Sequence, residues 1–220
     1  MPDERLGALA REVALELPGS YAERGRKNLG EQFHLQPVTD RVLQRLLPDW
    51  GPGVALSASK MFGKSLGWVG LGPVDLSFRV RDQLATVLEL KCGHDLSACA
   101  WDAVKLAAGV LDCHADSAYM LAGAPTAMWD KPTPGADLFS SASWLTMGPK
   151  IRDAHMKWWR AWQEETVAGR PNRHIPGLVS EAFETVALGS FPFQIDATPW
   201  ELRLARVKPH GSKAIVWKCV

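Results

Sequence analysis

The stretch of sequence that decides the fold is PVDLSFRVRDQLATVLELK, residues 73–91. Residues 74–80 and 84–91 are rich in apolar and β-branched side chains, and the polar segment 81–83 separates them. This pattern is typical of two antiparallel strands joined by a tight turn.

A turn centred on Asp82 places Asp75 directly opposite Glu89, since each lies seven residues from the centre. Directly opposed side chains in a strand pair lie about 5 Å apart at their Cβ atoms. Lys91 follows Glu89 by two residues and therefore points to the same face of the sheet. The register predicts that these three side chains share one small patch, and a slip of one residue would disperse them.

Two opposed carboxylates repel each other unless a positive charge lies between them. A divalent cation such as Mg²⁺ or Mn²⁺ supplies that charge, because it prefers carboxylate oxygens as ligands. Such an ion makes water easier to deprotonate and polarises a phosphoryl oxygen, while Lys91 can offset charge that develops on a phosphate. Asp75, Glu89 and Lys91 are therefore the groups that a phosphodiester hydrolase requires.

Upstream of this hairpin we expect mainly helices. Residues 2–17 form the first, which should break at Pro18-Gly19-Ser20. A second ends at Leu47 and begins at Tyr21 or Leu29, and Pro37 either restarts or kinks it. Residues 54–61 are expected to form a strand.

Downstream, residues 97–111 predict a helix buried through Trp101, Val104 and Ala108, and residues 118–124 predict a buried strand. The strand 84–91, this helix and the strand 118–124 make a βαβ unit, in which the two strands are expected to be parallel.

The motif Pro73-Val74-Asp75, thirteen residues, and Glu89-Leu90-Lys91 resembles the PD-(D/E)xK nuclease superfamily. The resemblance covers roughly residues 29–125. It implies an α/β restriction-endonuclease-like core of order αβββαβ, a mixed sheet flanked by helices. By resemblance, Asp75, Glu89 and the backbone carbonyl of Leu90 would be metal ligands for Mg²⁺ or Mn²⁺, and Lys91 would be the catalytic lysine.

Two further positions follow from the same resemblance. Members often add an acidic residue from the first helix, and Glu31 is the candidate, since it lies on the apolar stripe of that helix. Members also often carry a polar or basic residue on the helix after the ExK strand, where Asp102 and Lys105 stand. Lys105 is the candidate for nucleic-acid contact.

Residues 126–220 are expected to form a C-terminal α+β extension of a single domain, 1–220, whose nuclease-like core spans about 21–125. Within the extension we expect helices over residues 148–167 and 178–188. Strands are expected over residues 200–207 and 214–220, and these two strands could pair with each other.

The composition limits the other classes of function. The formal net charge is +1, so any nucleic-acid contact must come from a local cluster of basic residues. The four cysteines match no zinc-binding spacing and suit buried thiols in a reducing compartment. The ten tryptophans are more typical of a core than of a base-stacking surface.

The N-terminal segment lacks the apolar region of a signal peptide, and no apolar stretch is long enough to span a membrane. We therefore expect a cytoplasmic protein without a membrane partner.

The leading hypothesis is a metal-dependent nuclease whose partner is nucleic acid, DNA before RNA. The alternative is a catalytically inactive nuclease-fold protein that binds a partner in a defence or repair complex. A homodimer or another protein partner stays open. The third interpretation is an ordinary solvated hairpin in which Lys91 pairs with a carboxylate, an arrangement that contributes little to stability.

Overall fold

The structure is a computed structural model that describes residues 2–24, 29–47, 74–80, 83–99, 102–103, 106–107, 110, 116–131, 133–140, 176–177, 183–209 and 218–219. Several expectations fall outside these residues: the strand 54–61, the helix 148–167, the packing of Trp101, Val104 and Ala108, and the placement of Lys105.

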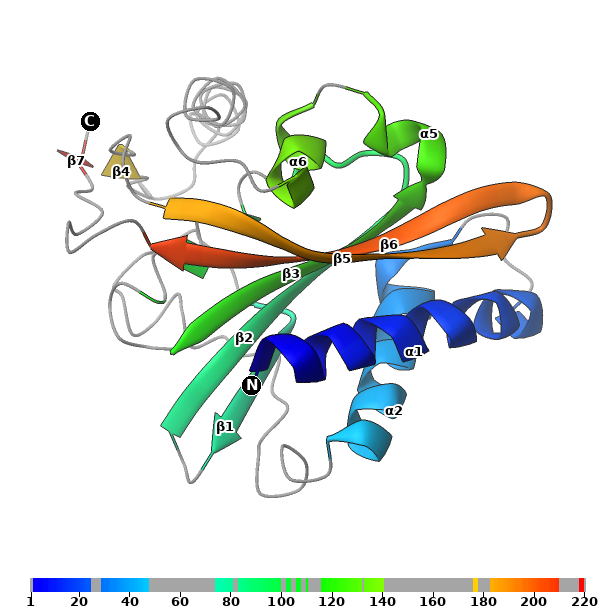
Figure 1. Cartoon of the computed structure of the whole chain (residues 1–220), viewed down its shortest axis with the longest axis horizontal. Helices are drawn as coiled ribbons and strands as arrows, with labels where there is room; N and C mark the ends of the chain where they lie inside the picture. Colours follow the sequence, from blue (N-terminus) through cyan, green and yellow to red (C-terminus); the bar gives the residue numbers. More distant parts are fainter. Residues whose placement is uncertain are drawn as a thin grey trace, which may run out of the picture.

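A five-stranded mixed sheet forms the centre of the described residues, in the order β1-β2-β3-β6-β5 (Figure 1). Its strands are β1 (Leu76–Val80), β2 (Gln83–Cys92), β3 (Ser117–Pro125), β5 (Phe183–Ile195) and β6 (Thr198–Pro209). β2 and β3 are parallel, as expected from the βαβ pattern, and the other neighbours are antiparallel. The α/β class expected from the sequence is confirmed.

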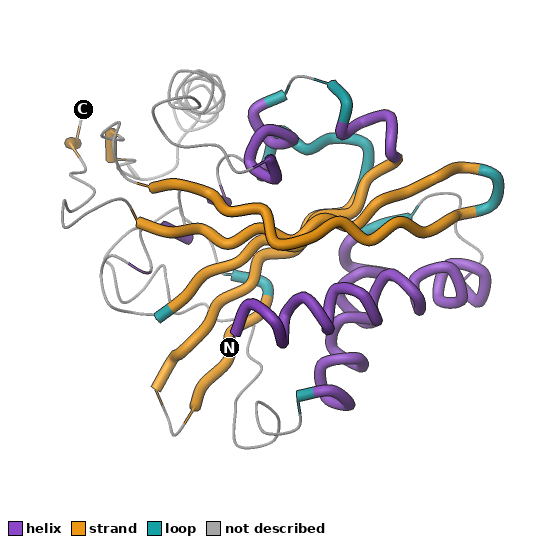
Figure 2. The backbone as a smooth tube through the Cα atoms, in the orientation of Figure 1, coloured by secondary structure: helices purple, strands orange, loops and turns teal. Residues whose placement is uncertain are grey.

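Helical layers cover both faces of this sheet (Figures 1 and 2). On one face lie α1 (Pro2–Arg24), the π-helix η1 (Glu31–Leu35) and α2 (Gln36–Leu46). On the other face lie α5 (Thr126–Trp129), α6 (Pro134–Asp137), the 3₁₀ helix η3 (Leu138–Ser140) and the described helical residues between 99 and 110.

Strand β3 shows why both faces need cover. All nine of its residues are buried. Ala118, Met120, Ala122 and Ala124 belong to the apolar cluster of one face, while Tyr119 and Leu121 belong to the cluster of the other. This is the alternation of a strand buried between two layers.

Helix α1 differs from the expectation, because it continues through Pro18 to Arg24. Proline removes one hydrogen bond from a helix interior, which is normally destabilising. Here the buried stripe that includes Leu17 resumes beyond the proline at Ser20. Packing of that stripe against the sheet therefore outweighs the lost hydrogen bond.

The second helix begins with a π turn, in which the backbone N–H of Leu35 donates to the carbonyl of Gly30 at 3.2 Å. Pro37 stands in the first positions of α2. The backbone of Leu35 and Gln36 is already helical, so the chain continues from one helix type to the next without an interruption. Because this helical run begins at Glu31, Pro37 lies beyond its first turn, and its missing N–H removes one hydrogen bond from the run.

The helix expected over residues 178–188 is wrong, because β5 begins at Phe183; residues 178–182 lie outside the described part. β5 and β6 form a hairpin whose last pair is Ile195 with Thr198. Asp196 in its turn adopts a φ of 52°. Aspartate tolerates this left-handed conformation, which two-residue hairpin turns require.

The strand expected over residues 200–207 is confirmed within β6, but its partners are β3 and β5. In the segment 214–220, the described pair Lys218–Cys219 forms β7, which pairs with β4 (Pro176–Gly177). The expected pairing of the two C-terminal strands with each other is wrong. The β5–β6 hairpin instead extends the sheet beyond β3.

Leu9→Ala is expected to lower the free energy of unfolding by about 2–5 kcal/mol, because Leu9 is 1% exposed within the α1 layer. Leu15 lies on the same helix and is 68% exposed, so Leu15→Ala is the matched control, with an expected change within about 0.5 kcal/mol. Urea denaturation measures both. Equal losses would contradict the placement of α1.

Candidate functional site

The β1–β2 register agrees with the predicted centre at residue 82. Leu76 pairs with Leu88, Ser77 with Val87 and Phe78 with Thr86. A bulge after Phe78 changes the pairing only toward the tip of the hairpin. At the other end, the ladder stops just before Asp75 and Glu89 would pair.

Beyond the last backbone pair of the ladder, the carboxylates of Asp75 and Glu89 accept hydrogen bonds from backbone N–H groups. The backbone N–H of Leu90 donates to Asp75 Oδ2 at 2.7 Å, and the backbone N–H of Asp75 donates to Glu89 Oε2 at 3.4 Å. Each acid therefore bonds to the backbone of the opposite segment. Glu89 is 3% exposed, so its carboxylate is held inside the molecule.

The Leu90 carbonyl was expected to be a metal ligand by resemblance. The N–H and the C=O of one strand residue point to the same side of the strand. Since the Leu90 N–H points toward Asp75, its carbonyl oxygen also faces the end of β1. This orientation brings the carbonyl to the same side as the two acidic residues.

Lys91 joins three elements of the fold. Its Nζ lies 3.2 Å from Asp102 Oδ2 and 3.6 Å from Glu31 Oε2. Glu31 opens η1, and Asp102 lies on the helix that connects β2 to β3. Glu31, Glu89 and Lys91 thus lie near one another at the end of β2.

The role of Asp102 was missed by sequence reasoning, which named the residue as available but did not place it against Lys91. Asp102 is 5% exposed, and the neighbours Cys99, Ala103 and Leu106 on its helix are buried in the apolar cluster. The only signal in the sequence is an acidic residue among apolar ones at helical spacing.

The charges of the cluster act on one another. Burial alone would lower the pKa of Lys91, but Asp102, Glu31 and Glu89 raise it above its ordinary value. Burial raises the pKa of Glu31, and the charges of Asp75 and Asp102 add to this effect, although Lys91 opposes it. The folded structure therefore favours the charged form of Lys91, whereas it disfavours the ionised form of Glu31.

Three carboxylates act on the Lys91 ammonium, those of Glu31, Glu89 and Asp102. Asp75 adds a fourth carboxylate beside Glu31 and Glu89. Such an excess of carboxylate oxygens has the donor chemistry that Mg²⁺ and Mn²⁺ prefer. Within the described part of the chain, no three His, Cys, Asp or Glu side chains are arranged to hold a metal ion. Asp75 and Glu31 would have to turn from their present partners toward a cation.

The cysteines near this cluster are free thiols. Burial, with a contribution from Glu31, raises the pKa of Cys92 to about 12. Burial also raises the pKa of Cys99, which is fully buried in the same layer as Asp102. Both thiols stay protonated at neutral pH, so they act as apolar side chains and not as thiolate ligands.

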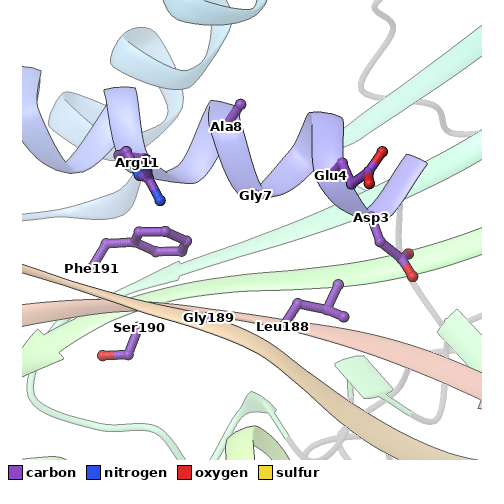
Figure 3. Close-up of a pocket in the computed structure, with 9 residues that line it drawn as sticks. All are labelled: Asp3, Glu4, Gly7, Ala8, Arg11, Leu188, Gly189, Ser190 and Phe191. Carbon is purple, nitrogen blue, oxygen red and sulfur yellow. The ribbon is translucent and has the colours of Figure 1, made fainter. Parts of the chain in front are cut away.

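A separate pocket of about 600 Å³ lies between α1 and β5 (Figure 3). Its lining includes Asp3, Glu4 and Arg11 from α1, and Phe191 from β5. Asp3 accepts a hydrogen bond from the Tyr119 hydroxyl at 2.7 Å, so this acid fastens α1 to the sheet. The carboxylate cluster around Lys91 contributes no residue to this pocket.

Two tryptophans in the described residues are buried, in agreement with the core interpretation. Trp129 is 6% exposed and lies beneath the Arg203 guanidinium, at 4.6 Å from the ring centre. Trp200 is 4% exposed and packs edge-on against the exposed His94 ring at 5.6 Å.

Searches of the chain against protein-family models, curated proteins and solved structures found no match. Among the described residues, no helix combines the length and the apolar character needed to cross a membrane.

Glu31→Gln is expected to raise the free energy of unfolding at neutral pH. The raised pKa means that ionised Glu31 is less stable in the folded chain than in the unfolded chain. This cost is absent below the ordinary pKa of 4.5, where the residue is protonated in both states, and it is complete above the raised pKa. Urea denaturation from about pH 4 to about pH 8 should show the gain growing with pH.

Glu16→Gln is the control of opposite sign. Burial would raise the pKa of Glu16, but hydrogen bonds from Arg41 and Arg45 lower it overall. Ionised Glu16 therefore stabilises the folded chain, and its replacement should cost stability at neutral pH, with the loss fading in acid. If the pH profile of Glu31→Gln parallels that of Glu16→Gln, the claim that ionised Glu31 destabilises the folded chain is wrong.

Proposed function

We propose that the chain is a metal-dependent nuclease with a PD-(D/E)xK site on a restriction-endonuclease-like core, followed by a C-terminal α+β extension. The observation that carries the proposal is the gathering of Asp75, Glu89, Lys91 and Glu31 at one end of β2. The substrate class is a phosphodiester, with DNA favoured over RNA, and the compartment is the reducing cytoplasm.

Each residue has a distinct task in this proposal. Asp75, Glu89 and the Leu90 carbonyl would hold a Mg²⁺ or Mn²⁺ ion, and Glu31 would complete the set from η1. When bound, the ion supplies Lewis-acid chemistry to the phosphodiester and to water. The chain supplies the geometry, because residues 89–91 belong to a strand that is buried on both sides.

Lys91 acts as a fixed positive charge. Because Asp102, Glu31 and Glu89 raise its pKa against the effect of burial, it carries a positive charge near neutral pH. A charged ammonium beside the scissile phosphate offsets the negative charge that develops during hydrolysis.

A second function is a nuclease-fold protein that binds a partner and does not cut. One observation favours it: Asp102 contacts Lys91 at 3.2 Å and offsets the charge that catalysis needs. In this alternative the cluster holds the helix after β2 against the sheet. Divalent cations then leave the stability of the chain unchanged.

The metal test uses thermal melts with Mn²⁺ and with EDTA. Wild type is expected to gain about 2.7 kcal/mol at a hundredfold excess of metal over Kd. Lys91→Ala should keep this gain, because lysine is not a ligand, and should lose cleavage of plasmid, linear or single-stranded DNA, or RNA. Asp75→Asn should lose both metal stabilisation and cleavage.

Asp130→Asn and Lys131→Ala are the matched controls, since both residues are exposed neighbours just after α5. They should leave the metal stabilisation and the cleavage unaltered. Absence of a metal-induced shift in wild type, together with intact substrates, would favour the binding protein.

A further inference from the structure

Asp102 is a carboxylate in an apolar layer. It is 5% exposed, and Cys99, Ala103 and Leu106 on the same helix are fully buried beside it. Burial of an ionised carboxylate is costly unless an opposite charge compensates it. The Lys91 ammonium lies 3.2 Å away and provides that charge.

The Lys91 ammonium lies near two acidic residues, which differ in their position and in their exposure. Glu31 Oε2 lies 3.6 Å from the ammonium, on the first helix, and Asp102 Oδ2 lies closer, on the helix that follows β2. Glu31 is the more exposed partner, with 24% of its side chain accessible against 7% for Asp102. The ammonium and a divalent cation would compete for the oxygens of Glu31.

We infer that Asp102 is a positioning residue: it holds the Lys91 ammonium on the side of the helix after β2, so that Glu31 and Glu89 keep their oxygens for a divalent cation. This inference rests on the proposed function. Without the Asp102 charge, Lys91 would turn fully to Glu31 or Glu89 and would oppose binding of the cation.

The test is a double-mutant cycle on Mn²⁺ affinity, measured by calorimetric titration of the full chain. Asp102→Asn should raise the Kd about tenfold, as loss of a supporting partner commonly does. In the Lys91→Ala background the same substitution should change the Kd by about twofold or less, because no ammonium is left to compete. Asp102→Glu keeps the charge and should restore the Kd to within about threefold of wild type.

Other roles for Asp102 give other patterns. If Asp102 acts only as a distant negative charge, Asp102→Asn weakens metal binding equally in both backgrounds, and the inference is overturned. If Asp102 only fastens the helix to the sheet, the Kd stays constant while the urea midpoint falls, which overturns it as well. If wild type binds no Mn²⁺, the proposed function itself fails, and that outcome is distinct from the other two.

A crystal structure of the unaltered chain with Mn²⁺ provides the same decision if Asp102→Asn does not fold. The ammonium of Lys91 is expected to stay within hydrogen-bond distance of Asp102, while Glu31 turns to the ion. Lys91 paired with Glu31 and withdrawn from Asp102 would overturn the inference.

Discussion

Strand β2 is buried on both faces, so its side chains must alternate between two apolar layers. Val87 belongs to the layer that contains Asp102, while Leu88 and Leu90 belong to the layer of α1 and α2. Glu89 and Lys91 lie two and four residues after Val87 on the same strand, so their side chains project to the same face, on the side of Asp102. A slip of one residue would send both charged side chains into the opposite layer and lift the leucines out of theirs. Packing of neutral residues thereby fixes the geometry of the charged ones.

The same burial gives the cluster its electrostatic character. Carboxylates near the end of β2 are too enclosed for water to screen them fully, and they outnumber the lysine at their centre. Replacing the surplus carboxylates with neutral polar groups is expected to relieve the repulsion within the cluster. Excess charge retained at one place is typical of sites where function limits stability.

Local pattern was enough to predict the hairpin and the parallel strand, because both consist of short runs of apolar and β-branched residues bounded by turn residues. It failed where neighbours distant in sequence decide the outcome. Residues 183–188 lack a strict alternation of apolar and polar side chains. They form a strand because they pair with the edge of β6. Pro18 stays helical because the sheet packs against the residues on either side of it. Asp102 meets Lys91 only after a helix folds back over the sheet, and no spacing in the sequence reports that contact.

The position of β3 has a consequence for how the chain acquires its structure. One edge of β3 pairs with β2. The other edge pairs with β6, whose residues follow about 80 positions later in the sequence. Helix α1, which precedes the sheet in the sequence, packs against β5 and β6, which follow it by more than 150 residues. During translation β3 therefore presents an open edge of apolar residues until residue 209 has left the ribosome. Such long-range closure favours slow folding. It also makes any fragment ending before residue 198 prone to edge-to-edge aggregation.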